Sequence, residues 1–219
     1  VGADRSQWID EKGFTSAFEQ AWKRLVEVRR REAVRKELDQ GRPTLVRTDL
    51  SKASRDDREL VKHLVVAARR IDALYMKQLG ADGLDKGLAP DDDASRALFH
   101  RNSGPWCEAA QTEKDPFCNG TPDFRPQRWG SYPIDEAQDA ELCDRLKALP
   151  NGQELLAPFT VVRKVNGQYV ARTLIEEYGP EMAAVAGDLR LAAKIAMGMK
   201  EKSLERYLLA AAKGFETND

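Results

Sequence analysis

Histidine and cysteine are scarce in this sequence of 219 residues, which contains two histidines and three cysteines. His63 and His100 lie far apart, and neither has a second histidine four residues away, so a helical zinc-binding pair is excluded. The cysteines lack the Cys-x-x-Cys spacing of zinc ribbons and thioredoxin-type redox sites. The sequence therefore predicts no metal ligand in this chain.

The common catalytic motifs are also missing. There is no Gly-x-Ser-x-Gly nucleophile elbow, no phosphate-binding loop and no dinucleotide fingerprint. The one prominent acid pair, Glu176 and Glu177, falls where we expect a helix to begin, and capping explains it. We predict no catalytic residue here.

Charge and hydropathy exclude two classes of partner. The net charge of -1 gives no long-range attraction to nucleic acid, and no apolar run approaches the roughly 20 residues that span a bilayer. The basic run at residues 29–31 is interleaved with Glu27, Glu32 and Glu37, which predicts a solvated helix face. The sequence starts at Val1 without a methionine, so we expect a processed or artificial start that lacks any targeting segment.

Hydrophobic periodicity indicates a mainly α protein, with helices over residues 14–40, 55–79, 90–101, 134–149, 180–199 and 203–215. The first two are expected to pair antiparallel. We predict a single helical domain over residues 1–219: a long helix pair (1–89), a middle section of short helix, irregular loop and helix (90–150), and a hairpin with a C-terminal helix pair (151–219). The expected inward residues of the first long helix are Phe14, Phe18, Ala21, Trp22, Leu25 and Val28. Those of the second are Leu60, Leu64, Ala68, Ile71 and Tyr75, in a face widened by Val61, Val65 and Leu74.

Two segments depart from helical periodicity. Residues 102–132 form a long aromatic-rich stretch, and because disordered segments are poor in aromatics, we expect an ordered loop that buries its rings. Residues 159–174 contain two β-rich runs separated by Asn166-Gly167, the pair that type I′ hairpin turns favour. The sequence therefore predicts one β-hairpin, packed on helices or in a larger sheet.

Cys107 and Cys118 lie within the irregular loop, 11 residues apart. A disulfide between them would stabilise the fold by roughly 3 kcal/mol and would imply an oxidising compartment. Free thiols in a cytosolic protein are the alternative, and the spacing alone leaves both open.

An ordered series of short motifs covers roughly residues 98–219. The series comprises 102–106 (Asn-Ser-Gly-Pro-Trp), 115–117 (Asp-Pro-Phe), 130–133 (Gly-Ser-Tyr-Pro), 158–163 (Pro-Phe-Thr-Val-Val-Arg), the Asn-Gly hairpin and an alanine-rich helix pair. In this order and spacing the sequence resembles the N-terminal region of bacterial proteins similar to the dipeptidyl-peptidase III family of zinc metallopeptidases.

The resemblance implies a supporting role. In that family the zinc-binding helices lie beyond the position of Asp219, so zinc is expected only in a missing C-terminal region. The chain is then a non-catalytic part of a zinc-dependent exopeptidase that acts on peptides. Its partner would be the remainder of the same polypeptide or a zinc-bearing chain. Asn102 and Trp106 are the candidates to line or support the substrate cleft, although a structural role, with Asn102 capping a helix end and Trp106 anchoring the loop in the core, is the favoured explanation.

The sequence departs from the family at Cys107, where an acidic residue is expected, and in residues 117–132, which contain fewer glycines. These changes put a ligand-contacting role for the loop in doubt and suggest an extracytoplasmic branch with a local disulfide; a cytoplasmic location is the alternative. A self-contained helical interaction module or an accessory subunit is the rival function.

Overall fold

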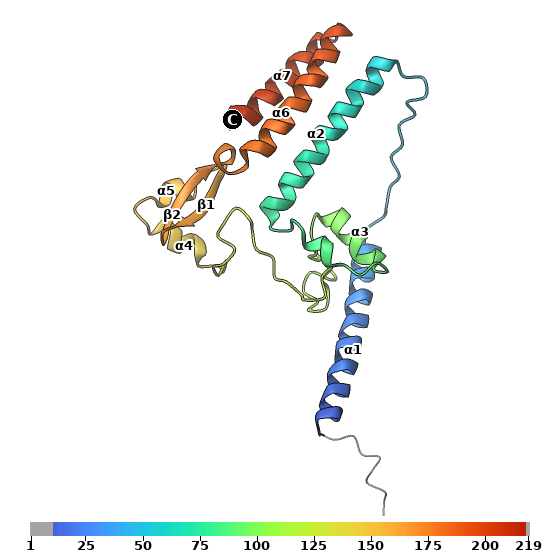
Figure 1. Ribbon diagram of the computed structural model, residues 1–219, viewed down its shortest axis with the longest axis vertical. Helices are drawn as coiled ribbons and strands as arrows, with labels where there is room; N and C mark the ends of the chain where they lie inside the picture. The colour runs from blue at the N-terminus through green and yellow to red at the C-terminus, as the bar shows by residue number, and fades with distance from the viewer. Residues whose placement is uncertain (1–10, 218–219) are drawn as a thin grey trace, which may run out of the picture. The chain divides into compact units, whose positions relative to one another are not determined.

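The computed structural model describes the backbone of residues 11–217 and the side chains from residue 15 onward. The chain divides into two compact units. The first unit combines the chain up to Pro43 with Gly83–Pro126, and the second combines Thr44–Asp82 with Gln127–Asp219. Seven α-helices and one two-stranded sheet lie in the described residues, so the mainly α class is confirmed (Figure 1).

The two units cut across the three sections predicted from the sequence. The two long helices fall in different units, so their antiparallel pairing stays a prediction. Phe14, the first residue of the expected stripe, has a side chain outside the described residues. None of the described helices is long and apolar enough to cross a membrane.

The first unit is built on helix α1 (Glu11–Asp39), which packs on α3 (Asp93–Asn102), with a short 3-10 turn at Leu84–Gly87. The expected apolar stripe of α1 is exposed: Phe18 and Trp22 are 61% and 55% accessible. The buried residues of α1 come from its C-terminal half. They are Arg30, Ala33, Val34 and Glu37, at helical spacing.

Arg30 corrects the prediction of a solvated basic face. Its side chain is 1% exposed and pairs with Glu27 and Asp92. It also donates to the Ser95 hydroxyl at 2.7 Å and to two loop carbonyls at 3.1 Å. A buried guanidinium is stable only when it has both a counter-ion and hydrogen bonds. Here the carboxylates provide the counter-ions, and Ser95 and the loop carbonyls accept the hydrogen bonds. Asp92 also caps α3 by accepting a hydrogen bond from the Ser95 amide.

Glu37 is the second buried charge of α1, with a fully buried carboxylate. Burial alone would raise its pKa, but hydrogen bonds from the Thr112 hydroxyl and from the backbone amides of Glu108 and Ala109 outweigh burial and lower the pKa. The carboxylate also pairs with Arg101. It therefore ties α1 to the start of the irregular loop.

The second unit is a set of packed helices that carries the hairpin. Helix α6 (Leu174–Gly198) contacts both α2 (Arg55–Leu79) and α7 (Lys202–Thr217), as Figure 1 shows. The buried positions of α2 are Leu60, Ala67, Leu74 and Leu79. The expected inward positions Leu60 and Leu74 are confirmed, whereas Ile71 and Tyr75 are exposed. Leu60 and Ala67 meet the small side chains of α6 at Ala192, Ala193 and Ala196, whereas Leu74 packs with Val161, Tyr178 and Met182.

The hairpin was predicted correctly. Strands β1 (Thr160–Val165) and β2 (Gln168–Thr173) pair antiparallel, and Asn166 and Gly167 both have positive φ. The two buried valines of β1 point to opposite faces: Val161 packs with residues of α2 and α6, and Val162 with residues of the short helices α4 (Leu142–Lys147) and α5 (Gly152–Leu155). The hairpin is thus packed on helices.

The helix expected over residues 134–149 is much shorter, because α4 begins only at Leu142. Side chains occupy the carbonyls that a longer helix would use. Arg128 donates to the carbonyls of Ile134 and Glu136, and Arg145 donates to that of Ala137. Periodicity could not reveal these competing partners.

Replacing Glu37 tests the buried carboxylate. We expect Glu37→Gln to lower the free energy of unfolding by about 3 kcal/mol at pH 7, because the amide donates where the carboxylate accepts. The native pKa is lowered, so the charge stabilises above the ordinary value near 4.5 and loses its effect as pH falls through the native pKa. The difference between the proteins should shrink below that pH.

Urea unfolding of both proteins between pH 7 and pH 3 measures this difference. Glu32→Gln is the matched control, since Glu32 lies on the same helix but is exposed. A difference that stays constant from pH 7 to pH 3 would contradict the account.

Candidate functional site

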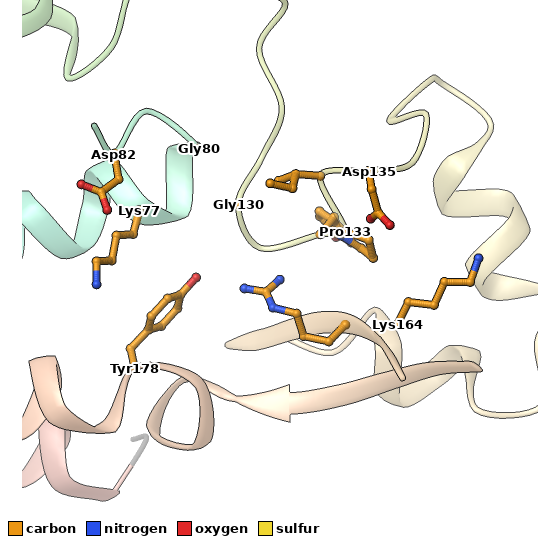
Figure 2. A pocket seen from close by; sticks show the side chains of 11 residues that line it. Lys77, Gly80, Asp82, Gly130, Pro133, Asp135, Lys164 and Tyr178 are labelled. Carbon is orange, nitrogen blue, oxygen red and sulfur yellow. The ribbon is translucent and has the colours of Figure 1, made fainter. Parts of the chain in front are cut away.

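A pocket of about 480 Å³ lies within the second unit (Figure 2). Its walls come from the C-terminal end of α2, the segment 130–135, strand β1 and the N-terminal part of α6. The pocket is therefore lined by segments that are far apart in the sequence. Its volume lies in the range of small-molecule binding sites.

Two glycines bring the end of α2 and the 128–130 segment into backbone contact. A β-carbon on Gly130 would lie 2.0 Å from the Lys77 carbonyl oxygen, and one on Gly80 would lie 1.9 Å from the Arg128 carbonyl oxygen. The Gly130 amide donates to the Gln78 carbonyl at 2.8 Å. Gly80 also ends α2 with a left-handed φ of 73°. Only glycine fits at either position without displacing backbone.

The same segment is fixed to the hairpin on its other side. The Val162 amide donates to the Ser131 carbonyl at 2.8 Å. Residues 128–131 therefore bridge α2 and β1 through main-chain hydrogen bonds. Main-chain hydrogen bonds therefore fix this wall of the pocket. The wall is part of the fold of the second unit and does not need a ligand to form.

Tyr178 lines the floor of the pocket at an irregular point of α6. The Thr173 hydroxyl and the Glu176 side chain form a capping box at the start of α6, which confirms the capping role of Glu176. Tyr178 then has non-helical angles (φ −121°, ψ 26°), just before Pro180, where the predicted helix was expected to begin. The kink places its side chain in the pocket (Figure 2).

The hydroxyl of Tyr178 is shielded from solvent, since the residue is only 6% exposed, and the Arg163 guanidinium is the group that faces it. The nearby Arg163 guanidinium favours the ionised form, but burial outweighs it and raises the pKa, so the group remains a donor at neutral pH.

Three cationic side chains line the pocket, and each forms an ion pair with a carboxylate. Lys77 pairs with Glu181, Arg163 with Glu177, and Lys164 with Glu136. The hydrogen bond that Lys77 donates to Glu181 raises the pKa of Lys77, and the one that Lys164 donates to Glu136 raises the pKa of Lys164. Both lysines therefore stay charged at neutral pH.

Two further carboxylates, Asp82 and Asp135, line the pocket. Figure 2 shows Asp82 beside Lys77 at the end of α2, and Asp135 on the segment that carries Pro133. The lining therefore combines cations and acids. Such a pocket can bind a small polar molecule that carries both acceptor and donor groups.

The predicted site residues Asn102 and Trp106 lie together in the first unit. The Asn102 side-chain amide donates to the Trp106 carbonyl at 2.9 Å, and the Trp106 indole donates to the Arg125 carbonyl at 3.0 Å. Trp106 also forms an isolated bridge with Asn119. Both side chains organise the irregular loop, and their role in a substrate cleft stays a prediction.

The predicted disulfide between Cys107 and Cys118 is confirmed, with the two α-carbons 5.8 Å apart. Cys143 is free and exposed. The rings of the loop are less buried than expected: Trp129 is 49% accessible, and Trp106 and Phe117 are half-buried. The disulfide and side-chain hydrogen bonds hold this segment where a core of aromatic rings was expected.

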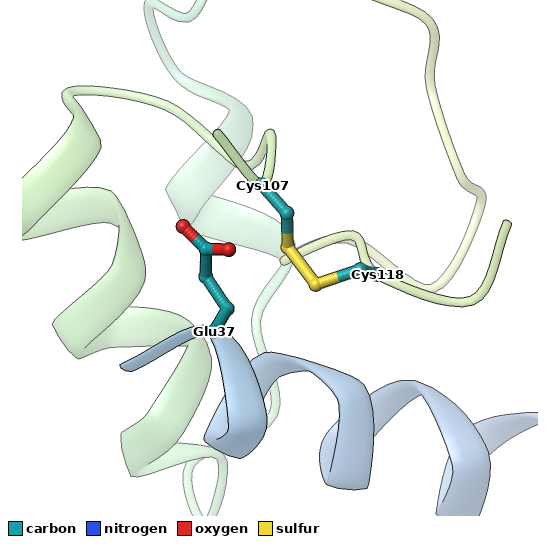
Figure 3. A group of neighbouring side chains, drawn as sticks. All are labelled: Glu37, Cys107 and Cys118. Atoms are coloured by element: carbon teal, nitrogen blue, oxygen red, sulfur yellow. A yellow bond between two sulfur atoms is a disulfide. The ribbon is translucent and has the colours of Figure 1, made fainter. Parts of the chain in front are cut away.

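One group of potential metal ligands gathers in the described residues: Glu37, Cys107 and Cys118 (Figure 3). It does not fit zinc. The two sulfurs are bonded to each other, so neither is a thiolate, and zinc binds thiolates. The Glu37 carboxylate already accepts hydrogen bonds from Thr112, two backbone amides and Arg101.

Sequence reasoning missed the residues that make the pocket. Tyr178 and Arg163 show no recognisable motif, and Lys77 reads as an ordinary basic residue near a helix C-terminus. Gly80 was recognised only as a helix stop, and Gly130 only as part of the Gly-Ser-Tyr-Pro motif at residues 130–133. That motif was the one available signal, because its glycine makes the backbone contact that closes the pocket wall.

Comparisons with known proteins identify the fold. No protein-family model matches the sequence, and neither does any curated protein. The structure of DPP III from Caldithrix abyssi is similar, with a TM-score of 0.65 and 26% identity over 84% of this chain and 35% of that chain. Dipeptidyl-peptidase III from Corallococcus sp. strain EGB gives a TM-score of 0.66 and 25% identity over 85% of this chain and 35% of that chain.

The chain therefore spans about a third of the length of the two solved structures. The predicted resemblance to the N-terminal region of dipeptidyl-peptidase III is confirmed.

The glycine contact yields a test with a built-in control. We expect Gly130→Ala to lower the free energy of unfolding by about 1–3 kcal/mol, because the new methyl group meets a main-chain oxygen that cannot rotate away. Gly187→Ala should be neutral or stabilising, since Gly187 lies inside α6 with nothing within 4 Å of an added β-carbon. Urea unfolding of the three proteins measures this, and equal stability of the two variants would refute the close packing.

Proposed function

We propose that this chain is the N-terminal, non-zinc region of a dipeptidyl-peptidase III-like zinc metallopeptidase, where it supports the substrate cleft and is inactive alone. The observation that carries the proposal is the structural likeness, which extends over 84% and 85% of the chain at 26% and 25% identity. Because the chain spans 35% of each solved structure, the remaining parts of the enzyme would come from other polypeptide.

The chemistry of the described residues supports a non-catalytic role. The one cluster that gathers metal-type ligands is a disulfide beside a saturated carboxylate, and it does not fit zinc. We therefore derive no zinc step through this chain. The proposal places zinc in the remainder of the polypeptide or in a partner chain, and peptide is the substrate of the complete enzyme.

The contribution of this region would be a rigid wall for the cleft. The backbone hydrogen bonds at Gly130 and Val162 and the buried network around Arg30 and Glu37 each hold an irregular segment on helices. Enzymes position substrates through such fixed scaffolds, since small displacements of contacting groups lower the rate. Asn102 and Trp106 remain the proposed cleft-supporting residues.

The disulfide supports an extracytoplasmic location, periplasmic or secreted, as part of the same proposal. Structural disulfides persist in oxidising compartments and are rare in the cytosol. Mass spectrometry of the protein isolated from its source under alkylating conditions tests this point. A Cys107–Cys118 crosslink supports the location, whereas two alkylated thiols would favour the cytoplasm.

Peptidase activity tests the main proposal. We expect the product of the complete source gene to release dipeptides from the N-terminus of a short peptide, and a zinc chelator to abolish the release. The chain of residues 1–219, assayed at the same concentration, should show no release with or without added zinc. Dipeptide release by the isolated chain, or a complete gene product that cleaves no peptide, would overturn the proposal.

A further inference from the structure

The exposed apolar side of α1 is a feature of the first unit that the fold of this unit does not explain. Phe18, Trp22, Leu25 and Val28 are between 45% and 61% accessible, and Ala21 is exposed between them. We call these five residues the α1 stripe. Single exposed apolar residues are ordinary on a protein surface, whereas a continuous group of them marks a surface that contacts something else.

The spacing of the α1 stripe fits a helix as its partner. Phe18, Ala21, Leu25 and Val28 follow one another at steps of three, four and three residues, which is the repeat of a coiled-coil seam. In such a seam each apolar side chain enters a hole between residues of the facing helix. Trp22 widens the α1 stripe on one side.

A pocket of about 560 Å³ lies directly beside the α1 stripe and belongs wholly to the first unit. Its lining comes from one side of α1 and from two apolar residues of the irregular loop: Trp22, Lys23, Val26, Glu27, Pro122 and Phe124. A partner that inserts a large side chain into such a pocket gains a central anchor for its contact. A helix packed on the α1 stripe would place one of its apolar side chains there.

Two arginines beside the α1 stripe have no carboxylate partner in the part of the chain that the structure describes. Arg24 forms no ion pair there, and Arg29 lies with its guanidinium 5.4 Å from the centre of the Phe117 ring. The next two arginines of α1 are both paired with carboxylates. A helix with acidic residues on either side of its apolar seam would therefore complement this surface.

The same charges oppose a second copy of this chain as the partner. In a parallel pair of helices, heptad geometry places Arg24 at the g position opposite Arg29 at the e position of the other copy. The antiparallel arrangement that sets Phe18 against Val28 brings two copies of Arg24 together. Like charges that face each other across an interface disfavour the complex.

We infer that the α1 stripe is the docking surface for an acidic amphipathic helix in the part of the enzyme that lies outside this chain. The apolar side chains of that helix pack on the α1 stripe and enter the pocket, and its carboxylates pair with Arg24 and Arg29. The inference rests on the proposed function, since this chain spans 35% of each similar structure and most of such an enzyme lies outside it.

The size of the α1 stripe favours a segment of the same enzyme over a free partner protein. Residues 18–28 extend about 15 Å along the helix, and a helix with its side chains is about 10 Å wide. This contact is far smaller than the roughly 800 Å² that each partner buries in a stable complex. A segment of the same polypeptide binds at a high effective concentration, so a small surface is sufficient.

Hydrogen exchange of the complete gene product, compared with the 219-residue chain, tests which part of the enzyme covers the α1 stripe. We expect the amides of residues 18–29 to exchange about tenfold more slowly in the complete product, because a packed helix opens less often. Equal exchange in a complete product that releases dipeptides would overturn the inference and leave the proposed function intact. A gene product that ends at Asp219 would overturn both.

A synthetic peptide tests the chemistry of the partner on the 219-residue chain itself. The probe is a three-heptad helix with Leu at positions a and d and Glu at positions e and g, and its control has Lys in place of Glu. NMR titration should give saturable shifts at Trp22 and Leu25 with the acidic peptide and about fivefold weaker binding of the basic one. Equal binding of the two peptides, or no saturable shift with either, would overturn the inference.

Charge reversal on α1 should reverse this preference. We expect the double variant Arg24→Glu and Arg29→Glu to bind the basic peptide more tightly than the acidic one. The matched control is Arg42→Glu with Arg47→Glu, which changes the net charge equally at exposed residues outside α1 and should bind as the wild type does. An unchanged preference in the first double variant would contradict the assigned pairing.

Removing one apolar side chain tests the stripe and separates docking from folding. Leu25→Gln should weaken the acidic peptide about tenfold, while its stability in urea stays that of the wild type, because Leu25 is exposed in the free chain. Sedimentation of the free chain and flotation with phosphatidylglycerol vesicles test the other occupants. Dimerisation or vesicle binding that Leu25→Gln abolishes, together with no shift from the acidic peptide, would overturn the inference.

Discussion

The close contact between the end of α2 and the segment around Gly130 is the constraint on which the second unit depends. Two main chains meet where an added β-carbon at either Gly80 or Gly130 would lie about 2 Å from a carbonyl oxygen. Since the segment is also hydrogen-bonded to β1, one irregular stretch joins a long helix to the hairpin. The pocket lies beside this junction, and Tyr178 reaches it through the kink in α6. A backbone contact thus sets the geometry of a polar site whose side chains come from four separate segments.

In the first unit, buried charged side chains fix the irregular segment. Its irregular loop contains few buried rings, so it is held by the disulfide and by two buried ionic side chains of α1. Arg30 donates to loop carbonyls, and Glu37 accepts from loop amides. Burying a charge is costly unless it is paired and hydrogen-bonded, and here the loop backbone supplies the missing bonds. The position of the loop therefore depends on α1, and the burial of Arg30 and Glu37 depends on the loop. This arrangement gives an irregular surface on a rigid helical support.

Sequence patterns predicted the parts of the fold that depend on local chemistry. The Asn166-Gly167 turn, the bounds of α2 and the capping role of Glu176 depend on neighbours within a few positions, and all three were predicted correctly. Long-range pairing was not predictable in the same way. Arg30 and Glu37 look like solvated residues of a charged helix until α3 and the loop bury them. Residues 134–141 have helical periodicity, but the side chains of Arg128 and Arg145 donate to carbonyls of this stretch. The pocket could not be predicted from the sequence for the same reason. Its residues form no sequence motif, and they come together only when distant segments pack in the fold. The family resemblance, in contrast, depended on the order of short motifs, which a linear reading preserves.

The central claim is that this chain is one region of a larger dipeptidyl-peptidase III-like enzyme, and the coding frame of the source gene tests it most directly. Sequencing that gene through and beyond the codon for Asp219 requires no assumption about folding or substrate. The account predicts a frame that continues for several hundred codons and encodes a His-Glu zinc motif followed by a further glutamate ligand. A stop codon directly after Asp219, with no neighbouring gene that encodes such a motif, would contradict the account and leave a helical interaction module as the better description.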